Sequence, residues 1–316
     1  MTRAVAAIDI GSNSTNLLVT DAAGAQIFRR VNVTALGEGV SRSGMLSTAA
    51  ISRTMHVIDG YARELKDLDA ELHITGTAAC RMAANTDDFF ALVRAATGVA
   101  PRLLSASDEA RLAWQGAVAN LPASDGTTMV IDIGGASTEL TIGAAEQTLP
   151  AARELESVSM PFGVVTLTET ELHGDPPRAE ELSNAVSMVG DAVDNAVIER
   201  PLLGDASRVV GVAGSIVTIA AVELGLREFD SSRLHGMFLT KDAAEDVFRT
   251  LATERLADRI HNPGLPVERA GVIVGGCCIL VAIMRRLGLD HIIVSTHNLL
   301  DGVVAEARLA RQGSQS

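Results

Sequence analysis

Two ten-residue segments of this chain carry the same arrangement of residues that could do chemistry. Residues 8–17 read IDIGSNSTNL and residues 131–140 read IDIGGASTEL, and seven of the ten positions are identical. In each copy an apolar run ends in an aspartate, Asp9 or Asp132, and a turn rich in glycine and serine follows. Such a turn exposes backbone N–H groups and small hydroxyls, which are suitable donors to phosphate oxygens.

The two turns hold the first candidate binding residues. Gly11 and Gly134 allow a close turn of the backbone. Donors to phosphate oxygens would come from Ser12, Asn13, Ser14, Gly135 and Ser137. A plain hairpin could use the same residues, so the argument depends on their repetition. Two such turns on two similar units could hold a polyphosphate from both sides, which predicts phosphoryl-transfer chemistry between two related domains.

The two aspartates are candidate metal ligands. An acid at the end of an apolar strand needs a partner, and a bound Mg²⁺ ion is a good one. The alternative is an acid that caps its own turn. The equivalent placement of Asp9 and Asp132 in the two copies favours the metal.

Glu109 is a candidate general base. It follows Asp108 in the first turn of a helix that we expect Ser107 to cap. A carboxylate there could accept a proton from water and aim that water at a terminal phosphorus. The alternative is that both acids only stabilise the positive end of the helix, and Asp108 is expected to keep that role.

The elements that must position these residues alternate between strands and helices. Apolar runs predict strands at 3–10, 15–21, 25–34, 72–76, 102–105, 127–133, 208–212 and 291–295. Apolar residues at helical spacing predict helices at 48–67, 86–96, 179–198, 215–224, 240–258, 268–287 and 298–311. The pattern indicates an α/β fold with two lobes, each with a mixed sheet and helices on both faces.

Composition narrows the class of protein. The chain has 316 residues, is 47% apolar and carries a net charge of −13. A protein that binds duplex nucleic acid usually has a basic face, and no run of Lys or Arg occurs, so nucleic acid is not an expected partner. No apolar stretch approaches the ~20 residues of a membrane span, and the N-terminus lacks the layout of a signal peptide. We expect a cytoplasmic protein, with no membrane partner, whose three cysteines are small buried residues.

Five segments, in order along the chain, together resemble the exopolyphosphatase/guanosine pentaphosphate phosphatase (Ppx/GppA) family. They are AIDIGSNS at 7–14, TAACRMA at 77–83, LSASDEARL at 104–112, VIDIGGASTEL at 130–140 and GVAGS at 211–215. Within the family the chain resembles the short exopolyphosphatases of actinobacterial type. The resemblance implies the two-lobed actin-like ATPase (ribonuclease H-like) fold, with mixed five-stranded sheets and an active site in the interlobe cleft. It implies a first lobe of residues 1–125 and 298–316 and a second lobe of 126–297.

The resemblance also implies roles for particular residues. Glu109 would be the general base, Arg81 a phosphate-binding arginine, and Glu139 a residue that positions metal or water. Gly214 and Ser215 match a glycine loop that contacts nucleotide in actin-like ATPases, although the loop could also only pack a helix on a strand. Ala136 stands in the second phosphate loop where the family usually has glycine. The implied cofactor is Mg²⁺ or Mn²⁺, and the implied assembly is a homodimer.

The leading hypothesis is a metal-dependent exopolyphosphatase that removes the terminal phosphate of inorganic polyphosphate. Short chains are expected substrates, because the chain lacks the helical C-terminal domains of long family members. Guanosine pentaphosphate is an alternative substrate for the same site. Two further alternatives are an ATP-dependent kinase of the same fold and a non-catalytic sensor of polyphosphate or alarmone.

Overall fold

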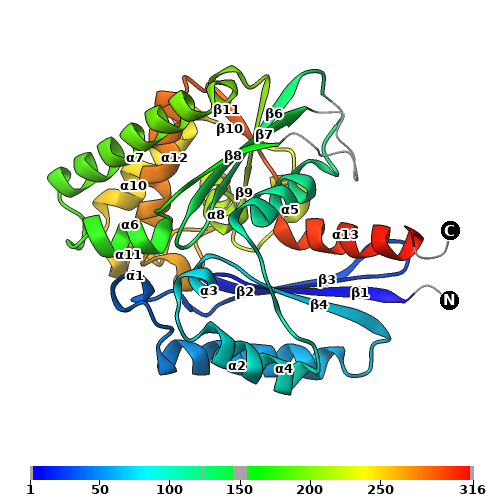
Figure 1. The fold of residues 1–316 in the computed structure, drawn as a ribbon. Helices are drawn as coiled ribbons and strands as arrows, with labels where there is room; N and C mark the ends of the chain where they lie inside the picture. The colour runs from blue at the N-terminus through cyan, green and yellow to red at the C-terminus, as the bar shows by residue number, and fades with distance from the viewer. Residues whose placement is uncertain (1–2, 123, 145–154, 314–316) are drawn as a thin grey trace. The chain divides into compact units, whose positions relative to one another are not determined.

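The computed structural model describes residues 3–122, 124–144 and 155–313 (Figure 1). The chain forms two compact units, one of Met1–Gly116 with Leu299–Ser316 and one of Ala117–Asn298. The first crossing between units falls inside helix α5 (Ala106–Val118) rather than at the predicted residue 125. Residues 314–316, which the prediction assigned to the first lobe, lie outside the described residues.

The first unit is built on a mixed five-stranded sheet in the order β3-β2-β1-β4-β5. Strands β1 to β3 form an antiparallel meander, and β4 and β5 continue the sheet in parallel with β1. The strands are β1 Ala4–Ile10, β2 Ser14–Thr20, β3 Gln26–Val33, β4 Ala70–Gly76 and β5 Arg102–Leu103. The carboxyl ends of the parallel strands therefore meet at one edge, where ligand sites of α/β sheets usually lie.

Helices cover both faces of this sheet, with α2 and α4 on one side and α13 on the other (Figure 1). Besides α5, they are α1 Val40–Ser43, α2 Thr48–Leu65, α3 Ala78–Met82, α4 Thr86–Thr97 and α13 Leu299–Gly313. The Ser47 side chain caps α2 by accepting from Ala50 N.

The last helix, α13, is fixed to the first unit by packing and by ion pairs. Leu300 lies in a core that includes Leu112 of α5. Asp301 accepts from Arg29 with both oxygens at 2.7 Å. Gly302 allows α13 and α5 to approach closely, because an added Cβ would lie 2.0 Å from the Leu112 carbonyl oxygen.

The second unit repeats this strand order and adds a strand. Its sheet runs β10-β11-β9-β6-β7-β8, with β6 to β8 antiparallel and β9 and β11 parallel to β6. The strands are β6 Thr127–Ile133, β7 Thr138–Ala144, β8 Glu156–Met160, β9 Arg208–Val212, β10 Phe238–Thr240 and β11 His291–Val294. The expected α/β class with two mixed sheets is confirmed. The expected five strands are wrong for this sheet, because the short strand β10 pairs with β11.

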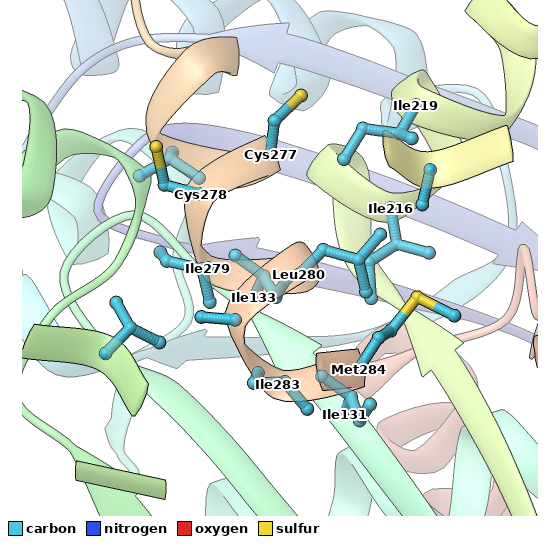
Figure 2. Close-up of a cluster of buried hydrophobic side chains, with 14 of the residues drawn as sticks. Ile131, Ile133, Ile216, Ile219, Cys277, Cys278, Ile279, Leu280, Ile283 and Met284 are labelled. Atoms are coloured by element: carbon cyan, nitrogen blue, oxygen red, sulfur yellow. The ribbon is translucent and has the colours of Figure 1, made fainter. Parts of the chain in front are cut away.

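The core of the second unit gathers around α12, which packs against α6, α7, α8 and α10 (Figure 1). Figure 2 shows α12 residues such as Leu280 and Met284 near Ile131 of β6 and Ile216 of α8. The helices are α6 Val164–Glu171, α7 Ala179–Glu199, α8 Ala213–Glu223, α9 Ser231–Leu234, α10 Lys241–Thr253, α11 Leu256–Arg259 and α12 Ile273–Arg286, with 3₁₀ turns at Pro201–Asp205 and Val267–Arg269.

All three cysteines are free and buried. Cys277 and Cys278 belong to the core of the second unit (Figure 2), and Cys80 lies in that of the first. Burial raises the pKa of all three thiols, that of Cys80 to about 12. No helix within the described ranges is long and apolar enough to cross a membrane.

Two helices of the second unit are shorter than predicted, since α10 ends earlier and α12 begins later. One buried arginine lies between them and bonds to the backbone of both flanking segments. Arg259, only 4% exposed, donates to the carbonyl oxygens of Leu251, Glu254 and Ala270 at 2.7–3.1 Å. These bonds fix the backbone between α10 and α12, where only the short helix α11 and one 3₁₀ turn form. The predicted helix at 240–258 therefore breaks after Thr253, and the one at 268–287 begins only at Ile273.

Candidate functional site

The two copies of the repeated sequence form the same backbone turn. In the first copy Gly11 N donates to Ser14 O at 3.0 Å, and in the second Gly134 N donates to Ser137 O at 3.0 Å. An added Cβ at these glycines would lie 2.9 and 3.0 Å from the same carbonyl oxygens. Neither residue has a positive φ, so glycine is needed there for the close approach of the backbone and not for its conformational freedom.

The carbonyl groups of both turns are bound by the segments that follow them. In the first turn Ser12 O accepts from Gly37 N at 2.7 Å, and Asn13 O accepts from Thr34 N and Ala35 N. In the second turn the first N–H groups of α6 do the same. Gly134 O accepts from Val164 N at 2.9 Å and Gly135 O from Val165 N at 2.8 Å.

Because the carbonyls are bound, the N–H groups of the turns are left as the available polar groups. The backbone N–H groups of Ser12, Asn13, Gly135, Ala136 and Ser137 donate to no group in the described part of the chain. Successive unpaired N–H groups in a turn form a concave anion site. Ala136 has no positive φ, so alanine fits here and supplies the same N–H group that a glycine would.

Asp9 lies one residue before the end of β1, at the carboxyl edge of the first sheet. Its two cross-strand neighbours are Asn16 of β2 and Thr75 of β4. Thr75 Oγ1 donates to Asp9 Oδ1 at 3.2 Å. Burial, and then repulsion by Glu109, raise the pKa of Asp9 from 3.8 to about 7, and hydrogen bonds from Thr75 and Asn16 only partly oppose them.

Asp132 has the equivalent place in the second unit, but its neighbour is different. It lies directly opposite Glu139 of β7, at the position that Asn16 has in the first copy. Opposed residues of an antiparallel pair place their side chains on the same face of the sheet. Glu139 Oε1 also accepts from Ser159 Oγ of β8 at 2.8 Å, and Glu139 is only 4% exposed.

Glu109 and Arg81 are brought together at the carboxyl edge of the first sheet. Arg81 lies in α3, after β4, and Glu109 lies in the first turn of α5, after β5. Arg81 Nη1 donates to Glu109 Oε2 at 2.5 Å and to Leu104 O at 3.1 Å. Burial raises the pKa of Glu109, and Arg81 partly lowers it. Arg81 Nε and Nη2 donate to no group in the residues that the structure describes, so they are available to an anion.

The two neighbouring acids of α5 have separate roles. Asp108 N donates to Ser105 Oγ at 3.0 Å, and Asp108 Oδ2 accepts from Ser105 Oγ at 2.9 Å. This bond to Ser105 holds the pKa of Asp108 below its usual value. The predicted capping residue, Ser107, is therefore wrong, since α5 begins at Ala106 and Ser105 caps it.

Gly214 and Ser215 lie in the first turn of α8, directly after β9. Strand β9 runs parallel to β6 and pairs with it up to Asp132, so this turn and Gly134–Ser137 lie at the same edge of the second sheet. An added Cβ at Gly214 would lie 2.2 Å from Arg269 Nη1, so the guanidinium lies directly on this glycine. The preceding Ala213 has a strained positive φ of 67°.

Arg269 is a candidate that the sequence did not reveal. Its guanidinium donates no hydrogen bond and forms no ion pair within the described residues, and burial lowers its pKa. The guanidinium is a planar fork that matches phosphate oxygens. Arg269 lies more than fifty positions from Gly214 and in no recognisable motif, so only the path of the chain held by Arg259 brings the two together.

The acids present fit a magnesium ion better than a metal that needs many protein ligands. No group of three or more His, Cys, Asp or Glu side chains in the described ranges is arranged to hold a metal ion. Magnesium usually keeps several waters and takes one or two carboxylates together with substrate phosphates. Asp9 in one unit, and the opposed pair Asp132 and Glu139 in the other, match that requirement.

The fold and the two turns define an α/β protein with a doubled anion-binding loop. The sequence profile of the Ppx/GppA phosphatase family matches residues 7–310, and the chain belongs to this family. Membership confirms the predicted class of protein, an enzyme that hydrolyses phosphoanhydrides.

Individual relatives agree with the family assignment. Exopolyphosphatase 2 of Mycobacterium tuberculosis is 32% identical over 95% of this chain and 97% of its own length. The guanosine-5'-triphosphate,3'-diphosphate pyrophosphatase of Aeromonas hydrophila is 31% identical over 95% of this chain but only 58% of its own length. Among solved structures, an exopolyphosphatase-like protein matches with a TM-score of 0.90 at 27% identity, covering 98% of this chain and 99% of its own. The Aquifex aeolicus family member has a TM-score of 0.79 at 28% identity, covering 98% of each chain.

Proposed function

We propose that this protein is an exopolyphosphatase that hydrolyses the terminal phosphoanhydride of inorganic polyphosphate. One observation carries the proposal: both repeats form the same turn. In each turn the carbonyl groups accept hydrogen bonds from the segment that follows, and N–H groups are left unpaired within the described residues. A chain of phosphates offers repeated oxyanions, which such turns can bind without any nucleoside. A relative similar over nearly its whole length is named an exopolyphosphatase, which also favours this substrate.

In the proposed reaction Glu109 accepts a proton from the attacking water. Its raised pKa brings the carboxylate closer to the working pH, where a general base is most effective. Arg81 holds Glu109 Oε2 and presents its remaining N–H groups to the phosphoryl group. The turns fix the phosphate oxygens so that the phosphorus faces the water.

Magnesium or manganese is proposed as the cofactor. The proposed ligands are Asp9 in the first unit and the opposed pair Asp132 and Glu139 in the second, and a bound ion would neutralise phosphate charge. Arg269, over Gly214, is proposed to bind a phosphate farther along the substrate. A homodimer remains an expectation from the family resemblance.

The test is phosphate release by the purified protein with Mg²⁺, comparing short and long polyphosphate, guanosine pentaphosphate and ATP. Glu109→Gln should lower kcat on polyphosphate by a factor of about 10² or more, as expected for loss of a general base. Asp108→Asn is the matched control, because it changes the neighbouring acid of the same helical turn and should keep most of the activity.

Each other result has a defined meaning. Preferred hydrolysis of guanosine pentaphosphate would replace the proposed substrate at the same site. Phosphate transfer from ATP to an added acceptor would favour a kinase. Tight binding of polyphosphate without turnover would favour a sensor.

A further inference from the structure

Asn16 has a buried oxygen atom without a hydrogen-bond partner. Its Oδ1 atom is inaccessible to solvent and receives no hydrogen bond from the described residues. Its Nδ2 atom donates to Ser14 Oγ at 3.1 Å. A buried acceptor without a donor costs free energy, so such an atom in a folded protein usually marks a place for a water molecule or an ion.

The position of Asn16 indicates which kind of group belongs there. Asn16 lies directly opposite Asp9, and the equivalent residue of the second copy, Glu139, lies directly opposite Asp132. Both copies therefore place a side chain with an acceptor oxygen beside the strand-ending aspartate. A phosphate oxygen would be repelled by such an acceptor, whereas a cation or the water molecules that surround it would be attracted.

The charge around Asp9 supports a cation. The charged side chain that acts most strongly on Asp9 is Glu109, which repels its ionised form. Asp9 accepts hydrogen bonds from Thr75 and from the amide of Asn16, and Asn16 Oδ1 receives no hydrogen bond from the described residues. Hard divalent cations bind carboxylate and amide oxygens together.

We infer that Asn16 is a neutral cation-positioning residue, whose Oδ1 atom and the Asp9 carboxylate together hold a hydrated divalent ion. The inference rests on the metal dependence within the proposed function and adds a residue to it. The first unit would then offer one acid and one amide to its ion, whereas the second unit offers two acids.

The test measures Mn²⁺ binding directly, by electron paramagnetic resonance of the free ion, with full-length protein and no substrate. Asn16→Leu should weaken binding about 10- to 100-fold, the usual cost of losing a residue that supports a metal site. Asn16→Asp keeps an acceptor oxygen and should bind at least as tightly as the wild type. Asn32→Leu is the control, since Asn32 is a half-buried amide of the same sheet that donates to Tyr61.

Several outcomes would overturn the inference. They are wild-type affinity in Asn16→Leu, equal weakening in Asn16→Asp and Asn16→Leu, and absence of Mn²⁺ binding by the wild type. If Asn16→Leu does not fold, Asn16→Asp decides by itself. Because binding is measured without substrate, a wild-type protein that binds Mn²⁺ but does not hydrolyse polyphosphate would refute the proposed function and leave the role of Asn16 standing.

Discussion

Arg81 donates to Glu109 at 2.5 Å, and the same nitrogen donates to the carbonyl oxygen of Leu104, which directly follows β5. One cation thus connects the segment after β4 with the segment after β5. Its charge lowers the pKa of Glu109, which burial otherwise raises.

Removing Arg81 should shift the pH dependence of hydrolysis. In Arg81→Met the pKa of Glu109 rises further, so the base is protonated up to a higher pH. The acidic limb of kcat/KM should therefore move to higher pH. Arg81→Lys keeps the positive charge but loses the planar fork. It should keep the acidic limb near its wild-type position while KM for polyphosphate rises. An unshifted limb in Arg81→Met would show that Glu109 is not the group that controls the rate.

Asp9 should make the protein less stable as the pH rises when no divalent ion is present. Its folded pKa of about 7 lies above the ordinary 3.8, so the folded state holds a proton that the unfolded chain has released. The loss of unfolding free energy caused by Asp9 is small below pH 4, grows between pH 4 and 7 and reaches its full value above pH 7. At 1.36 kcal/mol per pKa unit it reaches about 4 kcal/mol.

The variant Asp9→Asn removes this penalty and should abolish hydrolysis. Urea unfolding in EDTA should show a free energy of unfolding about 2–4 kcal/mol above wild type at pH 8. The difference should shrink steadily as the pH is lowered toward 4. A difference that does not change with pH would contradict the assignment to this carboxyl group.

Gly302 and Gly60 provide a matched pair of helical glycines. Gly302→Ala places a Cβ 2.0 Å from the backbone oxygen of Leu112, so α13 must move away from α5. The cost should be about 1–3 kcal/mol of unfolding free energy or more, as for other overpacked sites. Gly60→Ala in α2 meets nothing closer than 3.9 Å and should stabilise by about 0.5–1 kcal/mol. Chemical denaturation of both variants would check the opposite signs.

Gly134→Ala should damage catalysis through the shape of the turn. The new Cβ would lie 3.0 Å from Ser137 O, so the turn must give by a few tenths of an ångström and its N–H groups must move. Because misplacement of about 1 Å can cost about 10² in rate, this smaller shift should lower kcat/KM by less than that factor. Gly271→Ala is the control, because an added Cβ there meets nothing within 4 Å. Equal kcat/KM values for these two variants would argue against a role of the turn in binding.

Arg269 should act on binding rather than on chemistry. Arg269→Gln removes the charge over Gly214 and should raise KM for polyphosphate about tenfold, with kcat nearly unchanged. Arg249→Gln, on the exposed side of α10, should leave KM as it is. Steady-state phosphate release with chains of defined length measures both. A fall in kcat without a change in KM would contradict a role in substrate binding and would indicate that Arg269 acts on the reacting phosphate.

The parts of the fold that the sequence predicts well are those with local causes. Continuous apolar runs and the repeated turn define the strands around Asp9 and Asp132, and Ser47 marks the start of α2. The ends of α10 and α12 could not be predicted, because they depend on long-range bonds from Arg259.

The residues of the candidate site also divide into those that the sequence predicts and those that only the folded structure reveals. Glu109 is recognisable from its place in a motif, and its neighbour Asp108 from its place in a helical turn. The closeness of Arg269 to Gly214 is set by tertiary structure alone. The unpaired oxygen of Asn16 depends on which atoms surround it after folding. No spacing in the sequence records either of these facts.

The way in which the carbonyls of the two turns are bound has an evolutionary consequence. The groups offered to an anion are main-chain N–H groups, which every residue except proline possesses. Selection can therefore preserve recognition while side chains change, and Ala136, whose φ is not positive, still supplies its N–H group to the turn. What selection must retain is room at Gly11 and Gly134, where a single methyl group would force the turn to open. The two glycines are accordingly expected to be the slowest-changing positions of their loops across related genes.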